Sequence, residues 1–268
     1  MGPALLSETC RDQAALWLWP GQALYLGPSL NLGFHAGAVS CLAVGVDAGF
    51  TLELEDGARL KARTALVGAR VRHRIVADGA RMAFCYLDPA STRERACHSL
   101  MAEDHGEVAL GHRHEAELTA VAAGLAPGAP PADLRPWLDL AGPDRLSGRR
   151  DPRIRRAADR LADPAEPHLS AAELAADVGL SVSAFLRLFR AQTGTTFRRY
   201  RLWARMLRVA VLLETWPDLS TAAVEAGFAS PSHFSSTFHG MFGLRPSALF
   251  SQRVAVSWAE KPGQVTAQ

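Results

Sequence analysis

Four side chains in the second half of the chain have the types and spacing of a base-reading surface. Ser183, Leu186, Arg187 and Arg190 occupy positions i, i+3, i+4 and i+7, so a helix would present them on one face. The guanidinium of Arg187 can donate two parallel hydrogen bonds to O6 and N7 of guanine, which discriminates by about 1–3 kcal/mol. An exposed Leu186 could only touch a thymine methyl group. This face therefore predicts recognition of base edges in a DNA groove.

A second face of the same kind follows later in the chain and consists of Ser232, Ser235, Ser236 and His239. Because small hydroxyl groups read bases weakly, we expect this face mainly to position the protein on the DNA backbone. Three arginines between the two faces begin a helical stretch; they are Arg198, Arg199 and Arg201. They would contact phosphates or only keep the helix soluble, and the sequence leaves both interpretations open.

Both faces belong to a duplicated segment that covers residues 169–194 and 219–243. The equivalent pairs, all 49 residues apart, are Phe185 and Phe234, Phe189 and Phe238, Ser181 and Ser230, and Gly194 and Gly243. Gly179 and Gly227 stand at the turn of each copy, where a left-handed backbone favours glycine. Each copy thus predicts a helix, a tight turn and a second helix, the arrangement that places its second helix in the major groove.

Local signals support the helix ends. Ser170 and Glu173 form a capping-box pattern, and Ser181 and Ser230 are good N-cap residues for the two second helices. Residues 197–216 predict one long helix of roughly 30 Å, at 1.5 Å per residue. Since successive major-groove faces lie about 34 Å apart, one such helix could hold two reading units over neighbouring grooves.

The first half of the chain has a different pattern of apolar and polar residues. Period-two alternation and regular turn residues predict short antiparallel strands at 40–46, 50–54, 64–68, 71–76 and 81–87, as in a sandwich or barrel. Residues 107–125 carry apolar residues at helical spacing, and 131–141 predict a further short helix. Residues 142–153 are rich in charge, glycine and proline and indicate a linker. The fold class we predict is an all-β barrel with following helices, joined to an all-α domain.

Charge divides the chain in the same place. Residues 1–144 hold 12 basic and 17 acidic side chains, a net charge of −5, whereas residues 145–268 hold 17 and 10, a net charge of +7. A basic half joined to an acidic half indicates nucleic-acid binding by the basic part. No apolar run approaches the roughly 20 residues of a membrane span, and no signal peptide is predicted, so we expect a cytoplasmic protein without a membrane partner.

The histidines do not predict a metal site or an active site. His112 and His114 form the one HxH pattern of the chain, but they fall in a segment that we interpret as helical, where the two imidazoles would point apart. No Ser-His-Asp or Cys-His arrangement can be placed, and the four cysteines lack CxxC spacing. We therefore predict no metal, no cofactor and no enzyme activity. The first half offers candidates for an effector pocket, for which filling of the core is an equally good interpretation; they are Trp17, Trp19, Phe34, His35, His73 and Phe84.

Residues 150–250 resemble the DNA-binding domain of the AraC/XylS family of bacterial transcription regulators. The resemblance rests on LAADVGLSVSAFLRLFRAQTG, on YRLWARMLRVAVLL, and on AAVEAGFASPSHFSSTFHGMFGLRPSALF with its closing FG-x-x-P. It implies base contacts at Ser183, Leu186 and Arg187 and at Ser232, Ser235 and Ser236. Two departures are notable, because Ser236 replaces a common arginine and Arg245 replaces a common small hydroxyl residue.

The resemblance also implies an organisation for the whole chain. It predicts a cupin-like effector-binding barrel over 1–105, a helical dimerisation segment over 106–141, a linker over 142–150, a DNA-binding domain over 151–250 and a tail over 251–268. The implied partners are operator DNA, a second copy of the chain, a small-molecule effector and RNA polymerase, with activation and repression both open. Two alternatives remain, namely a constitutive regulator whose barrel only dimerises and a cupin-type metalloenzyme fused to a DNA-binding domain.

Overall fold

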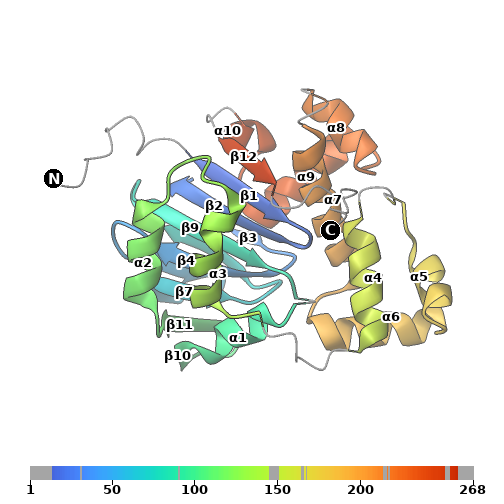
Figure 1. The fold of residues 1–268 in the computed structure, drawn as a ribbon, viewed down its shortest axis with the longest axis horizontal. Coiled ribbons are helices and arrows are strands. Elements are labelled where there is room, and N and C mark those ends of the chain that lie inside the picture. The colour runs from blue at the N-terminus through green and yellow to red at the C-terminus, as the bar shows by residue number, and fades with distance from the viewer. Residues whose placement is uncertain are drawn as a thin grey trace.

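The computed structural model describes residues 14–30, 32–89, 91–144, 151–163, 166, 168–213, 216, 218–250 and 254–258. Within them the chain forms a β-rich N-terminal part of two sheets and a helical C-terminal part (Figure 1). The predicted fold class is thereby confirmed. None of the described helices is both long enough and apolar enough to span a membrane. Most of the predicted linker, 145–150, lies outside the described residues.

The larger sheet has eight strands in the order β10-β11-β7-β4-β9-β2-β1-β12. Their bounds are β10 (Met101–Asp104), β11 (Val108–His112), β7 (Thr64–Val67), β4 (Ser40–Gly45), β9 (Arg81–Leu87), β2 (Gln22–Pro28), β1 (Ala15–Trp19) and β12 (Ala255–Trp258). All neighbouring strands are antiparallel except β1 and β12, which are parallel. Since β12 comes from the far end of the chain, the C-terminal residues complete the edge of the N-terminal sheet.

The smaller sheet has the order β3-β8-β5-β6. Its strands are β3 (His35–Ala36), β8 (Arg72–Val76), β5 (Phe50–Leu54) and β6 (Arg59–Ala62). The five strands predicted from alternation correspond to β4, β5, β7, β8 and β9. The turn residue Gly57 has a φ of +89°, which places it in the left-handed region that favours glycine.

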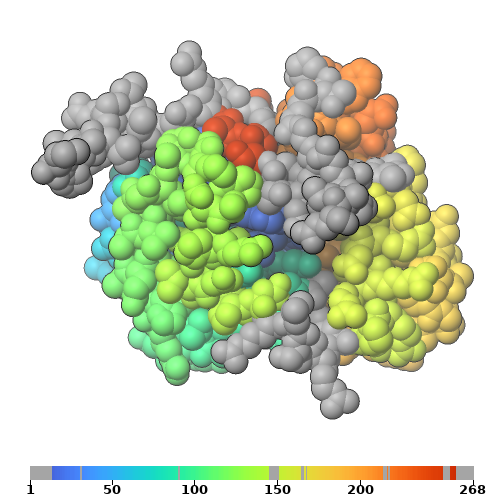
Figure 2. Space-filling view, viewed as in Figure 1, coloured from blue at the N-terminus to red at the C-terminus, as the bar shows by residue number. Residues whose placement is uncertain are grey.

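Helices cover the outer face of the larger sheet (Figures 1 and 2). They are α1 (Arg93–Ser99), α2 (Glu115–Gly124), the short 3-10 helix η2 (Pro131–Leu134) and α3 (Arg135–Ala141). The predicted helix over 107–125 was too long, because residues 108–112 form strand β11 and only 115–124 are helical. Both periods fit this apolar segment, and pairing with β7 and β10 decides in favour of the strand.

The C-terminal part contains two helix-turn-helix units and the helix between them. Its helices are α4 (Pro152–Ala162), α5 (Ala171–Asp177), α6 (Val182–Thr193), α7 (Phe197–Leu212), α8 (Leu219–Glu225), α9 (Pro231–Phe242) and α10 (Pro246–Phe250). We call α5–α6 the first unit and α8–α9 the second unit. The predicted capping box of Ser170 and Glu173 is present, and the Ser181 and Ser230 hydroxyls accept backbone N–H bonds at the starts of α6 and α9.

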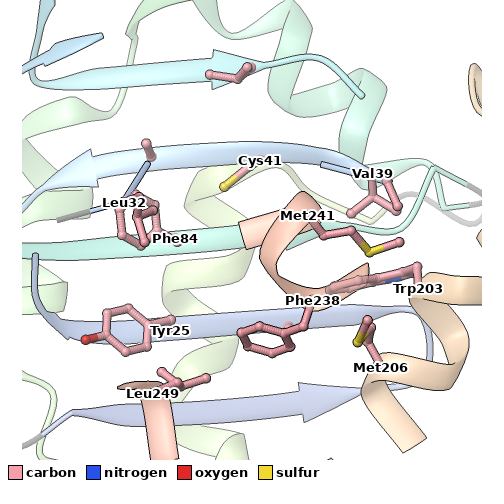
Figure 3. Packing of buried hydrophobic residues seen from close by; sticks show 14 of the residues in the cluster. Tyr25, Leu32, Val39, Cys41, Phe84, Trp203, Met206, Phe238, Met241 and Leu249 are labelled. Atoms are coloured by element: carbon pink, nitrogen blue, oxygen red, sulfur yellow. The ribbon is translucent and has the colours of Figure 1, made fainter. Parts of the chain in front are cut away.

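The two units have different cores. The first unit packs with α4 and the start of α7 into a cluster of its own, around Phe185, Phe189 and Tyr200. The apolar residues of the second unit instead form one continuous cluster with the inner face of the β part. Figure 3 shows Phe238 of α9 and Trp203 of α7 lying against strands of the sheet. The second unit therefore covers the part of the larger sheet that the smaller sheet leaves open.

Candidate nucleic-acid interface

The first unit presents the predicted reading face to solvent. Phe185 and Phe189 of α6 are fully buried, whereas Ser183, Arg187 and Arg190 are exposed. The turn before α6 contains Gly179, with a φ of +69°, as the turn chemistry predicts. The Ser181 hydroxyl, 3.3 Å from the Ala184 nitrogen, accepts its N–H and caps the helix. The N-terminal end of α6 is therefore well defined.

Two large apolar side chains also lie exposed on α6. Val182 and Leu186, one turn apart, are 43% and 39% exposed. Single exposed apolar residues are ordinary on protein surfaces, but this pair lies beside Arg187 on the helix end that faces outward. Sequence reasoning missed Val182. Its position at the start of α6, outside the buried phenylalanine stripe, is the signal that could have identified it.

The second unit keeps its predicted face accessible as well. Ser232, Ser236 and His239 are exposed and Ser235 is half-buried. The Ser236 hydroxyl donates to the His233 carbonyl within the helix, at 3.1 Å. This face holds no residue with the bidentate donors of arginine, so its potential for base discrimination is lower than that of α6.

The arginines at the start of α7 separate into two kinds. Arg198 is exposed, whereas Arg199 is half-buried and its Nη2 lies 3.3 Å from the carbonyl oxygen of Ala36 in the β part. Arg201 donates to the Leu169 carbonyl and lies over the ring of Phe197. Of these three arginines, Arg198 is therefore the exposed one.

The helix between the units is shorter than predicted. It spans 16 residues, 197–212, which corresponds to about 24 Å instead of roughly 30 Å. Several of its side chains bind the β part: the Tyr200 hydroxyl lies 3.0 Å from Oδ1 of Asp88, and the Trp203 indole N–H donates to the Gly21 carbonyl at 2.9 Å. Helix α7 is thus part of the boundary between the β part and the second unit as well as a spacer.

An apolar cavity of about 70 Å³ lies at this boundary. We call it the interface cavity. Its walls come from β1, β2 and β9 on one side and from α7, α9 and α10 on the other. The lining residues are Leu16, Leu18, Ala23, Tyr25, Leu30, Leu32, Phe84, Tyr86, Trp203, Met206, Leu207, Val209, Ala210, Phe234, Phe238, Phe242, Leu244 and Leu249.

The predicted effector-pocket residues do not all line one cavity. Trp17 and Trp19 lie on the outer face of the larger sheet, under the covering helices, and the Trp17 indole N–H donates to the Ala129 carbonyl. Of the six candidates Phe84 alone lines the interface cavity. Alternation correctly puts Trp17 and Trp19 on one face of β1, but it does not say which face looks inward, and the inward residues are Leu16 and Leu18.

The remaining candidates lie in or beside the β part. His35 and His73 are buried with ring centroids 4.4 Å apart, and together with Phe84 they line a small second cavity of about 10 Å³. Phe34 is half-buried, and the Arg74 guanidinium lies over its ring. His35 and His73 pair across β3 and β8, which is why two histidines distant in sequence meet.

The HxH pattern also lies elsewhere than predicted. His112 ends strand β11, and His114 precedes α2 as its N-cap residue. The Nδ1 atom of His112 accepts the His114 backbone N–H, and its Nε2 lies 3.1 Å from the Ala141 carbonyl. Both ring nitrogens of His112 therefore have structural partners. Within the described part of the chain, no group of three or more potential ligands is placed to hold a metal ion.

Lowering the pH is expected to weaken the fold through His35. Burial, and then the proximity of His73, lowers the pKa of His35 to about 4, with smaller effects from Arg72 and His239. In the unfolded chain His35 has a pKa near 6.5, so on acidification the unfolded state takes up the proton before the folded state does. Above about pH 6.5 the neutral His35 costs the folded protein nothing. As the pH drops toward 4, the free energy of unfolding decreases by roughly 3 kcal/mol, because the unfolded chain binds the proton more tightly.

Urea unfolding at pH 7.5 and pH 5 measures this effect. His35→Asn retains a donor for the Gly33 carbonyl but removes the titration, so it should reduce the loss of stability between the two pH values. His98→Asn, on the exposed surface of α1, is the control and should leave the loss unchanged. An unaltered pH dependence in His35→Asn would contradict the prediction.

Comparisons with known proteins agree with this geometry. Residues 174–252 match a family described as a helix-turn-helix domain. The probable transcriptional regulator LumQ of Photobacterium leiognathi is 36% identical over 80 residues, which cover 30% of this chain and 32% of LumQ. The chain thus matches about a third of the length of this curated relative, and the match falls short of the whole protein.

Solved structures of ToxT from Vibrio cholerae share the fold over most of the chain. An apo variant has a TM-score of 0.53 at 12% identity and covers 87% of this chain and 97% of its own. ToxT with a bound unsaturated fatty acid has a TM-score of 0.52 at 10% identity, covering 90% and 95%. ToxT with a methylnaphthalenyl butenoic acid has a TM-score of 0.50 at 13% identity, covering 90% and 98%. Residues 174–252 therefore belong to a helix-turn-helix domain family, and the chain as a whole shares its fold with ToxT.

Proposed function

We propose that the protein is a sequence-specific DNA-binding transcription regulator whose activity responds to a small-molecule effector. The observation that carries this proposal is the pair of helix-turn-helix units, each with a capped second helix and an accessible reading face. The net charge of +7 over residues 145–268 supports it, because phosphate neutralisation dominates DNA affinity. The curated relative LumQ is a probable transcriptional regulator, and we propose no catalytic role or cofactor.

The two units contribute differently to recognition. The first unit supplies most of the direct base readout, through Arg187 with Ser183 and Leu186, and Arg190 extends this face. The second unit mainly docks, through Ser232, Ser235, Ser236 and His239. Arg198 is exposed for a phosphate contact, whereas Arg199 and Arg201 would have to leave the carbonyls that they bind in this structure.

Effector control acts at the boundary between the β part and the second unit. The interface cavity supports this proposal because its walls come from both sides of that boundary. The structures of ToxT with bound acids support it as well, since ToxT shares this fold. Such control requires an effector that binds the two arrangements of the second unit with different affinities.

The remaining proposed partners rest on the family resemblance alone. We propose that the protein acts as a homodimer through residues 106–141, contacts RNA polymerase, and works in the cytoplasm on nucleoid DNA. In this structure α2 and α3 cover the outer face of the sheet, where they are accessible to a second copy (Figure 2). A wholly constitutive regulator would differ in having no effector that changes its operator affinity.

Capture of genomic fragments by the purified full-length protein tests DNA binding and also identifies the operator. The salt dependence of binding to the captured site tests how the protein binds. Six phosphate contacts predict a slope of about −5 in a plot of log affinity against log salt concentration. A flat dependence, or no enrichment of any sequence, would contradict the proposal.

A further inference from the structure

The interface cavity has two walls of different rigidity. On one side, β1, β2 and β9 are joined by continuous backbone ladders. On the other side, the second unit and α7 contact the β part mainly by side-chain packing with a few hydrogen bonds, and beyond α10 strand β12 forms a backbone ladder with β1. One of these few hydrogen bonds is the backbone bond from the Gly33 N–H to the Gly243 carbonyl, at 2.9 Å. The part of the helical wall that the second unit contributes through α9 is therefore the part that can move.

The cavity contains no charged group. All of its lining residues are aliphatic or aromatic. The polar atoms of Tyr25 and Trp203 are already engaged, because the Tyr25 hydroxyl donates to the Pro28 carbonyl and the Trp203 indole N–H donates to the Gly21 carbonyl, both at 2.9 Å. Burial lowers the pKa values of His35 and His73 in the neighbouring cavity, so those imidazoles are neutral at pH 7.

These observations determine which ligands the cavity can hold. Removing an ionised carboxylate from water is costly unless a cation or several donors compensate it. The described lining residues offer no cation, and beyond the engaged Tyr25 and Trp203 their one further side-chain donor is the hydroxyl of Tyr86. Resting on the proposed function, we propose that the effector is an uncharged, mainly apolar molecule and that this chain discriminates against carboxylic acids. In this respect its site would differ from that of ToxT, whose solved complexes contain acids.

The size of the cavity indicates what binding does. An engineered apolar cavity of about 150 Å³ holds benzene, whereas the interface cavity measures about 70 Å³. A ligand of even one aromatic ring must therefore widen it. Because the strands are joined by ladders, widening separates the second unit from the sheet and weakens the Gly33–Gly243 bond. The first unit has its own core and is not displaced.

Two probes of nearly equal shape test the ligand class, namely 1-naphthalenemethanol and 1-naphthoate. Calorimetric titration of the full-length protein without DNA at pH 7 should show at least tenfold tighter binding of the alcohol. If the acid binds only in its neutral form, its affinity should rise about tenfold for each pH unit between pH 7 and pH 5, because its ordinary pKa is near 4. The affinity of the alcohol should not change with pH in this way.

Variants locate the site. Leu244→Arg places a cation at a half-buried position of the lining and should favour the acid over the alcohol relative to the parent protein. Leu30→Arg is a second variant of the same design, in case the first alters packing. Ala210→Leu fills the cavity and should weaken binding of the alcohol. Amide exchange at Gly33 should accelerate when the alcohol binds, whereas amides of α6 should exchange as before.

The outcomes separate this inference from the proposed function. Equal affinity for alcohol and acid at pH 7 would overturn the proposed ligand class. Absence of binding by both probes would show that the cavity is only a packing gap and would also overturn the inference. Binding of the alcohol by a protein that captures no DNA would leave the inference standing and reject the regulator instead.

Discussion

Replacing Gly243 with alanine is expected to destabilise the protein by several kcal/mol, and the same replacement at Gly194 by much less. Both glycines end the second helix of a unit in the left-handed conformation, with φ values of +73° and +67°. A side chain in that conformation costs about 1–2 kcal/mol at either position. Gly194 has open space where a Cβ would lie, so no further cost arises there.

Gly243 differs because the β part lies against it. A Cβ at this position would be 2.4 Å from the Gly33 carbonyl oxygen and 2.9 Å from Nδ1 of His35. Since backbone atoms cannot move aside cheaply, we expect a further loss of roughly 1–3 kcal/mol. The Gly33–Gly243 hydrogen bond would be strained by the same displacement.

Urea unfolding of the two variants measures the difference, and amide exchange at Gly33 locates it. The pair is well matched, because each substitution adds one methyl group to the same type of helix end. Equal losses of stability at the two positions would show that the second unit does not rest against β3 in solution. That result would also remove the basis for coupling through the interface cavity.

Arg187→Ala is expected to reduce affinity for the captured operator by roughly 5- to 150-fold, which corresponds to about 1–3 kcal/mol. The exposed guanidinium on α6 is the strongest candidate for a bidentate contact to guanine. Its loss should also relax specificity at one base pair. Arg198→Ala, at the exposed start of α7, is the control, and the phosphate contact proposed there should lower affinity about equally for all sequences.

Binding to a panel of operators with single base changes distinguishes base readout from phosphate contact. Ser236→Ala should alter the sequence preference less than Arg187→Ala, because a single hydroxyl discriminates bases weakly. If Ser236→Ala relaxed specificity more, the assignment of direct readout to the first unit would be wrong. Folding of each variant can be checked by its urea unfolding curve, since both positions are exposed.

Much of the helical part could be predicted because its signals are local. A capping serine, a turn glycine and a phenylalanine stripe each act within one or two turns of chain, and Ser181, Gly179 and Phe185 lie in the structure where these rules place them. The faces of α6 and α9 could be predicted for the same reason. Strands β4, β5, β7, β8 and β9 could be predicted because apolar and polar residues alternate along them or because turn residues bound them at regular intervals.

The errors occurred where long-range packing decides. β11 was predicted as helix because an apolar segment fits both periods until its partner strands are known. Trp17 and Trp19 were open both to a pocket and to filling of the core, and only the packing of the covering helices on the sheet places them in the core. A usable signal did exist in α7, where Met206, Leu207, Val209 and Ala210 are apolar on every side, a pattern that indicates burial from two directions.

The sequence by itself therefore determined the two reading units, their caps and their exposed faces, since short-range hydrogen bonds and helical periodicity are sufficient for them. Only the tertiary structure decided that the second unit shares its core with the β part while the first does not, and that β12 returns to pair with β1. The physical reason is that hydrophobic burial is non-directional, so an apolar face does not specify which surface will cover it.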